Sequence, residues 1–142
     1  MKTKIQQAII GGIVATAVMT MVMFIAPFMG MPKMNASAML SMMLGVPLIV
    51  GWLMHFMIGI IFALSYVFLF INLVKKIKSK VLKGAIFGFA VFIFAQIVMA
   101  MMKMLMPMPA MEGSMMLMMF GSIIGHVIYG IVVAMFVKEQ VA

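Results

Sequence analysis

Four apolar stretches, each long enough to cross a membrane, constrain this chain more than any motif does. They cover approximately residues 5–28, 48–73, 81–105 and 115–137. A spanning helix needs about 20 predominantly apolar residues, and charged residues make up only 8% of the 142-residue chain, too few for a water-soluble surface. The sequence therefore predicts an all-α, polytopic membrane protein, a four-transmembrane-helix bundle forming one transmembrane domain over residues 1–142.

The lysines lie unevenly about these stretches and indicate an orientation. Lys33 and Lys103 lie at one side of the predicted bundle, and eight lysines lie at the other: Lys2, Lys4, Lys75, Lys76, Lys78, Lys80, Lys83 and Lys138. Basic residues near helix ends favour the cytoplasmic side. We therefore expect cytoplasmic N- and C-termini and a basic cytoplasmic loop over 74–83. This loop would attract anionic lipid headgroups, and we expect no nucleic-acid partner.

An amino-terminal signal peptide is the competing interpretation of the lysines that precede the first apolar stretch. The stretch is long for a signal peptide, and residues 27–32 lack a small-residue cleavage site. We therefore expect the first helix to be retained in the membrane.

The second and fourth stretches share a pattern that indicates an internal repeat. His55 and Gly59 correspond to His126 and Gly130, and further small residues continue the four-residue spacing on each helix. Two spans per repeat return the chain to its starting side, which relates parallel repeats by an axis along the membrane normal. The sequence predicts two tandem parallel helix-hairpin repeats, approximately 5–73 and 81–137.

A Met/Pro-rich outer loop, residues 29–47, joins the first two predicted helices. Asn35 is a suitable N-cap and Gly45 a suitable end for a short helix between them. We favour a helix lying in the membrane interface, with re-entry into the bundle as the alternative.

Twenty-four methionines fall into two blocks, with none between Met57 and Met99, and the predicted topology places both blocks on the outer side. Met-x-Met spacings recur, as at Met106 and Met108. Thioethers are soft ligands that select Cu(I), although methionine also fills gaps and suits adaptable protein surfaces. The candidate Cu(I) ligands are His55, His126, Met19, Met23, Met54, Met102 and Met118.

The two histidines are the sharpest site candidates, because an ionisable residue within a span is costly without a partner or a role. One alternative is haem b held by His55 and His126, with Gly59 and Gly130 letting a flat ring approach the backbone. The other is helix packing through small residues, as at 84–88 and 121–125, with the histidines hydrogen-bonded to each other or to Ser122 or Thr20.

Several stretches of the sequence match a pattern that is typical of one protein family. They are Gly-Gly-Ile-Val-Ala-Thr-Ala-Val-Met-Thr at 11–20, Gly-Met-Pro-Lys-Met at 30–34, Gly-Trp-Leu-Met-His-Phe at 51–56 with Gly59, and His-Val-Ile-Tyr-Gly at 126–130. The chain resembles, over most of its length, an uncharacterised family of small four-helix prokaryotic integral membrane proteins. The resemblance implies the four-helix fold and a location in the prokaryotic inner (cell) membrane. It implies no activity and no residue roles.

The predicted function is that of a non-catalytic protein. The spans hold no carboxylate, and the chain has no cysteine and no Ser/His/Asp set, so we expect no enzyme. We expect an accessory or structural subunit in the lipid bilayer that packs with other membrane subunits, for example of a respiratory assembly, or with copies of itself. The alternatives are a Met/His-rich Cu(I)- or haem-binding membrane protein and a small transport or permeation protein.

Overall fold

The computed structural model describes residues 3–105 and 113–138. Most of these residues are helical. The main helices are α1 (Lys4–Ile25), α3 (Leu48–Ser65), α5 (Lys80–Leu105) and α6 (Met115–Phe136). Helix α1 continues into the 3₁₀ segment η1 (Ala26–Met29), and α3 continues through the π-helical segment η2 (Tyr66–Phe70) into α4 (Ile71–Leu73). The predicted all-α fold with four helices long and apolar enough to span a membrane is confirmed.

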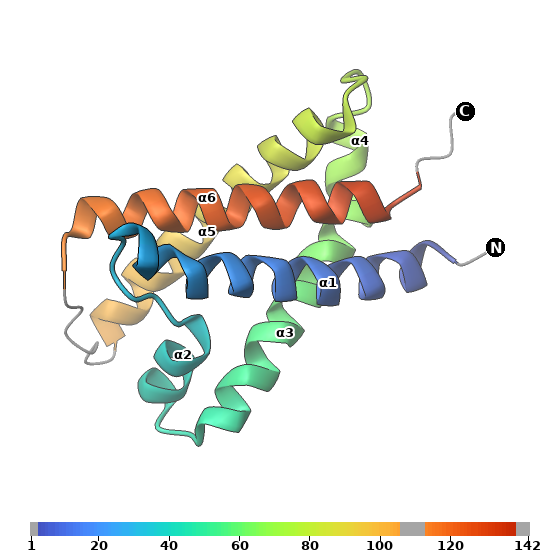
Figure 1. Cartoon of the computed structure of the whole chain (residues 1–142). Coiled ribbons are helices and arrows are strands. Elements are labelled where there is room, and N and C mark those ends of the chain that lie inside the picture. Colours follow the sequence, from blue (N-terminus) through green and yellow to red (C-terminus); the bar gives the residue numbers. More distant parts are fainter. Residues whose placement is uncertain (1–2, 106–112, 139–142) are drawn as a thin grey trace.

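The four long helices form a row in which α1 and α6 occupy the centre. Helices α1 and α6 run side by side in opposite directions, α3 packs against α1, and α5 packs against α6 (Figure 1). The start of α1 and the end of α6 meet, since the Lys138 amide donates to Gln7 Oε1 at 2.8 Å. We call this the lysine-rich end. The opposite end, where α1 and α5 finish and α3 and α6 begin, is the Met-rich end.

Glycines allow the backbones of each neighbouring pair to touch. A Cβ on Gly12 of α1 would lie 2.9 Å from the Cα of Ile60 in α3, and a Cβ on Gly84 of α5 would lie 2.5 Å from the Cα of Ile131 in α6. Such contacts supply the van der Waals attraction that holds helices together in lipid. The two contacts use corresponding positions, as tandem repeats would, although the repeat itself stays a prediction.

The buried core lies in the lysine-rich half and draws on α1, α3, η2, α5 and α6. Tyr129 of α6 donates its hydroxyl hydrogen to the Gly59 carbonyl of α3 at 2.5 Å, which links the two helix pairs. The π-helical segment carries Tyr66 into this core, where its ring meets Phe87 of α5 edge-on at 4.9 Å between centroids. An aromatic contact therefore joins η2 to α5 at this end.

The predicted short helix in the Met/Pro-rich loop is confirmed as α2 (Ala36–Leu44). The Asn35 side chain accepts from the Ala38 amide at 3.0 Å, and Gly45 ends the helix with a φ of +62°. Helix α2 packs on α3, where the Ser37 carbonyl lies against Gly51. Only a glycine leaves room for that carbonyl.

The basic loop is shorter than the predicted 74–83, because α5 begins at Lys80. The Ser79 hydroxyl accepts from the Leu82 amide at 3.3 Å, which starts the helix early. Lys80 then donates to the Val137 carbonyl at 3.3 Å beyond the end of α6, and Lys83 is 3% exposed. Lys83 is therefore buried among the helices, and Lys80, although exposed, bonds to the end of α6. Lys75, Lys76 and Lys78 remain in the loop. Lys2, Met106, Met108, Met111 and the rest of 106–112 lie outside the described residues.

Replacing Gly88 with alanine should destabilise the fold, because the new Cβ would overlap the His126 carbonyl and the Val127 Cα of α6. Overpacking of this kind costs about 1–3 kcal/mol. Gly125→Ala is the matched control, since the atoms nearest to its Cβ belong to the flexible side chains of Met19 and Met23 rather than to backbone. In thermal denaturation in detergent, we expect the midpoint of Gly88→Ala to fall well below that of Gly125→Ala. Equal midpoints would contradict the assigned contact.

Candidate functional site

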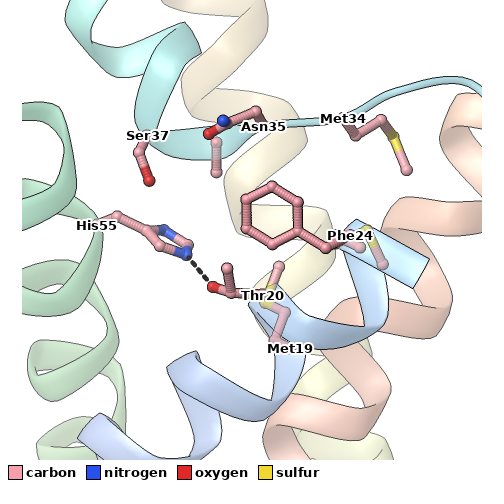
Figure 2. Close-up of a pocket in the computed structure, with 9 residues that line it drawn as sticks. Met19, Thr20, Phe24, Met34, Asn35, Ser37 and His55 are labelled. Atoms are coloured by element: carbon pink, nitrogen blue, oxygen red, sulfur yellow. Dashed lines mark hydrogen bonds between the residues drawn. The ribbon is translucent and has the colours of Figure 1, made fainter. Parts of the chain in front are cut away.

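A small cavity lies at the Met-rich end, between α1, the segment before α2, and α3. Figure 2 shows side chains from all three facing it. Its volume is ≈ 20 Å³, enough for about one water molecule or ion. The lining residues are Met19, Thr20, Met23, Phe24, Met34, Asn35, Ala36, Ser37 and His55.

His55 is held in this cavity by a hydrogen bond that fixes which ring nitrogen carries the proton. Its Nε2 lies 3.2 Å from Thr20 Oγ1, as Figure 2 shows, and that hydroxyl donates to the Thr16 carbonyl at 2.8 Å. A hydroxyl has a single hydrogen, so Thr20 accepts from His55 rather than donating to it. A neutral His55 therefore carries its proton on Nε2 and a free lone pair on Nδ1.

His126 has a different partner and the opposite tautomer. Its Nδ1 lies 2.7 Å from the Ser122 carbonyl, which can only accept, so Nδ1 carries the proton and Nε2 the lone pair. Its ring contacts Phe92 of α5 edge-on at 5.9 Å, and it does not line the cavity. Thr20 and Ser122 are the partners that the sequence predicts for histidines without a cofactor.

Two glycines of α6 hold the ends of methionine side chains. A Cβ on Gly121 would lie 2.5 Å from the Met34 Cε and 2.8 Å from the Met31 Cε. A Cβ on Gly125 would lie 2.7 Å from the Met23 Cε and 3.5 Å from the Met19 Cε. The sequence predicts helix packing at this Gly-x-x-x-Gly spacing. Gly125 does serve helix packing, since α1 packs on α6 and its Met19 and Met23 side chains contact this glycine, whereas Gly121 meets methionines of the loop before α2.

The predicted Cu(I) ligands divide into two groups. Met19, Met23 and His55 line the cavity, whereas His126, Met54, Met102 and Met118 do not. Met34 lines it as well, although the sequence gives no reason to prefer it over other methionines of the loop. Its position depends on Asn35 capping α2 and on α2 packing against α3. Of these two features, the sequence indicated only the cap.

The glycines assigned to a haem ring are occupied by neighbouring helices. A Cβ on Gly59 would overlap the Thr16 hydroxyl of α1, and one on Gly130 would overlap the Gly84 carbonyl of α5. A flat ring could approach these glycines only if the helices separated. The haem alternative therefore does not fit these residues, because glycine spacing serves close helix contact here.

The cavity offers soft donors rather than charged ones. Within residues 3–105 and 113–138, no group of three or more His, Asp or Glu side chains gathers that could hold a metal ion. Three methionine thioethers and one imidazole line the cavity instead. Sulfur and imidazole ligands suit soft transition-metal ions, whereas Mg²⁺ and Ca²⁺ prefer oxygen.

Among the described residues, four helices long and apolar enough to cross a membrane indicate a multi-pass membrane protein. More specifically, the chain belongs to DUF6789, a family of unknown function whose model matches residues 2–140. The match agrees with the resemblance to an uncharacterised family, while the prokaryotic origin stays a prediction. No curated protein and no solved structure matches the chain.

The hydrogen bonds predict opposite tautomers for the two histidines, which ¹⁵N NMR of histidine-labelled protein in micelles can measure. We expect an unprotonated Nδ1 in His55 and an unprotonated Nε2 in His126. Thr20→Val should remove the preference of His55, because the acceptor is lost, and Thr20→Ser should retain it. His126 is the internal control and should not change. The same tautomer in both wild-type histidines would refute the assignment.

Proposed function

We propose that this protein is a non-catalytic accessory subunit that assembles with a transmembrane helix of a partner protein. The observation that carries the proposal is an open groove between α3 and α5, the two outer helices of the row. A closed four-helix bundle would bring these helices together, whereas here each packs mainly on its own central neighbour. One side of the protein is therefore left concave within the membrane.

The groove is apolar and of substantial size. Its volume is ≈ 480 Å³, and Phe62 of α3 meets Phe94 of α5 edge-on across it at 5.7 Å between ring centroids. Each wall carries one small side chain, Ser65 on α3 and Ala90 on α5, among larger ones. The full lining is Ile58, Ile61, Phe62, Ser65, Phe87, Ala90, Val91 and Phe94.

A partner helix suits this groove because helices in lipid associate through close packing rather than through a hydrophobic driving force. Ser65 and Ala90 leave room for a second backbone to approach. The Ser65 hydroxyl is already bonded to the Phe62 carbonyl at 2.7 Å. No polar group in the groove therefore needs a polar ligand. Exposed methionines such as Met57 and Met101 add a deformable surface toward the Met-rich end.

The proposal includes an orientation. Lys75, Lys76 and Lys78 are exposed in the connection between α4 and α5, which favours a cytoplasmic lysine-rich end. The Met-rich end would then face outward. A role in permeation stays a separate prediction.

A photoreactive benzophenone amino acid placed at Phe94, in the groove, should give a crosslink to one partner protein in native membranes. Phe120 on α6 is the matched control, because it is similarly exposed, 63% against 55%, but lies outside the groove. We expect a single heavier band from the Phe94 position, identified by mass spectrometry, and only lipid adducts from Phe120. Lipid adducts alone at Phe94 would contradict the proposal. A crosslink to a second copy of this chain would reject the accessory role.

A further inference from the structure

We propose that the cavity at the Met-rich end binds one Cu(I) ion through the thioethers of Met19, Met23 and Met34, with the His55 imidazole as fourth donor. These residues come from α1, the segment before α2, and α3, and all four line the same small space. Figure 2 labels Met19, Met34 and His55 around it. The site is independent of the groove on which the proposed accessory function rests.

The donor set determines the class of ion. Thioether and imidazole are neutral, and thioether is the soft ligand that distinguishes Cu(I) from the hard cations. None of the residues that line the cavity is charged, and Lys33, the neighbour of Met34, is exposed to the outside. A cavity of ≈ 20 Å³ holds about one ion without its hydration shell. A divalent hard cation would lack the carboxylates that it needs.

The histidine is prepared for this role by the groups behind it. Metal-bound histidines almost always donate their second ring hydrogen to a fixed acceptor, which orients the ring and raises its basicity. His55 donates to Thr20, and Thr20 donates in turn to the Thr16 carbonyl. This chain of hydrogen bonds leaves the Nδ1 lone pair as the donor to a metal.

Helix α6 contacts the side chains of the three methionines but supplies no donor atom to the proposed site. Met19 and Met23 lie one turn apart on α1, so their side chains leave the same face. Their tips contact Gly125, and the tip of Met34 contacts Gly121 one turn earlier. These glycines therefore support three of the methionine side chains that line the cavity.

The cavity combines the methionines with four polar residues, Thr20, Asn35, Ser37 and His55. Thr20 and His55 are bonded to each other, and Asn35 accepts from the Ala38 amide as the cap of α2. These bonds hold the imidazole in place beside the thioethers, and an oriented imidazole is what a metal site requires.

Anaerobic titration of the purified full-length protein with Cu(I), in competition with a chromophoric Cu(I) chelator, tests the site. We expect wild-type protein to bind one equivalent and Met19→Leu/Met23→Leu/Met34→Leu to lose that binding, because leucine keeps the apolar volume but removes the sulfur. The matched control replaces three exposed methionines, Met21, Met101 and Met104, with leucine and should bind as wild type does. Equal affinity in the two triple variants, or no tight binding by the wild type, would overturn the proposal.

Gly125→Ala provides a second test that removes no donor and should preserve the fold. Its Cβ would push the tips of Met23 and Met19 out of position. Disturbing the support of a metal ligand weakens affinity by about 10- to 100-fold, so we expect a loss in that range with a near-wild-type melting midpoint. Cu(I) affinity unchanged in a folded Gly125→Ala variant would also count against the site.

Discussion

Close backbone contact at glycines is the interaction on which this structure depends. Lipid tails are as apolar as the side chains, so moving a side chain from lipid into a helix contact gives little free energy. Helices in a membrane therefore associate mainly where their surfaces fit closely. Gly12 and Gly59 provide that fit between α1 and α3, and Gly84, Gly88 and Gly130 provide it between α5 and α6. The Tyr129 hydrogen bond to the Gly59 carbonyl then joins the two pairs.

These contacts lie away from the Met-rich end, and the structure of that end follows from their position. Helix α3 crosses α1 and continues away from the row, as Figure 1 shows, which leaves space that α2 and the segment before it fill. Methionines suit such a space because their flexible side chains adapt to irregular gaps. The groove between α3 and α5 lies nearer the lysine-rich end, since Phe87 and Val91 of its lining also belong to the buried core.

Much of the fold could be predicted because length and hydropathy determine where spans begin and end. The expected stretch 48–73 agrees with the span Leu48–Leu73, and the Asn35 cap and the Gly45 terminus are local signals that need no tertiary information. The predicted stretch 81–105 agrees with α5 (Lys80–Leu105) to within one residue, whereas the predicted basic loop 74–83 overlaps the first turn of that helix. A run of lysines suggests a solvated loop, but the Ser79 cap starts the helix at Lys80.

The site could be predicted only in part, because spacing does not say what a glycine contacts. The spacings at 84–88 and 121–125 are identical, yet the first meets helix backbone and the second meets methionine tips. Gly59 and Gly130 likewise contact helices rather than a ring. Met34 reaches the cavity through the path of the loop, which no local pattern encodes.

The most direct test of the methionine site is X-ray absorption at the copper edge on protein loaded with one equivalent of Cu(I). The proposed donors predict a reduced copper ion whose first coordination shell is dominated by sulfur, with one nitrogen scatterer from His55. A shell of nitrogen and oxygen alone would contradict the site. With that result, the cavity would be a gap in the packing with room for about one water molecule.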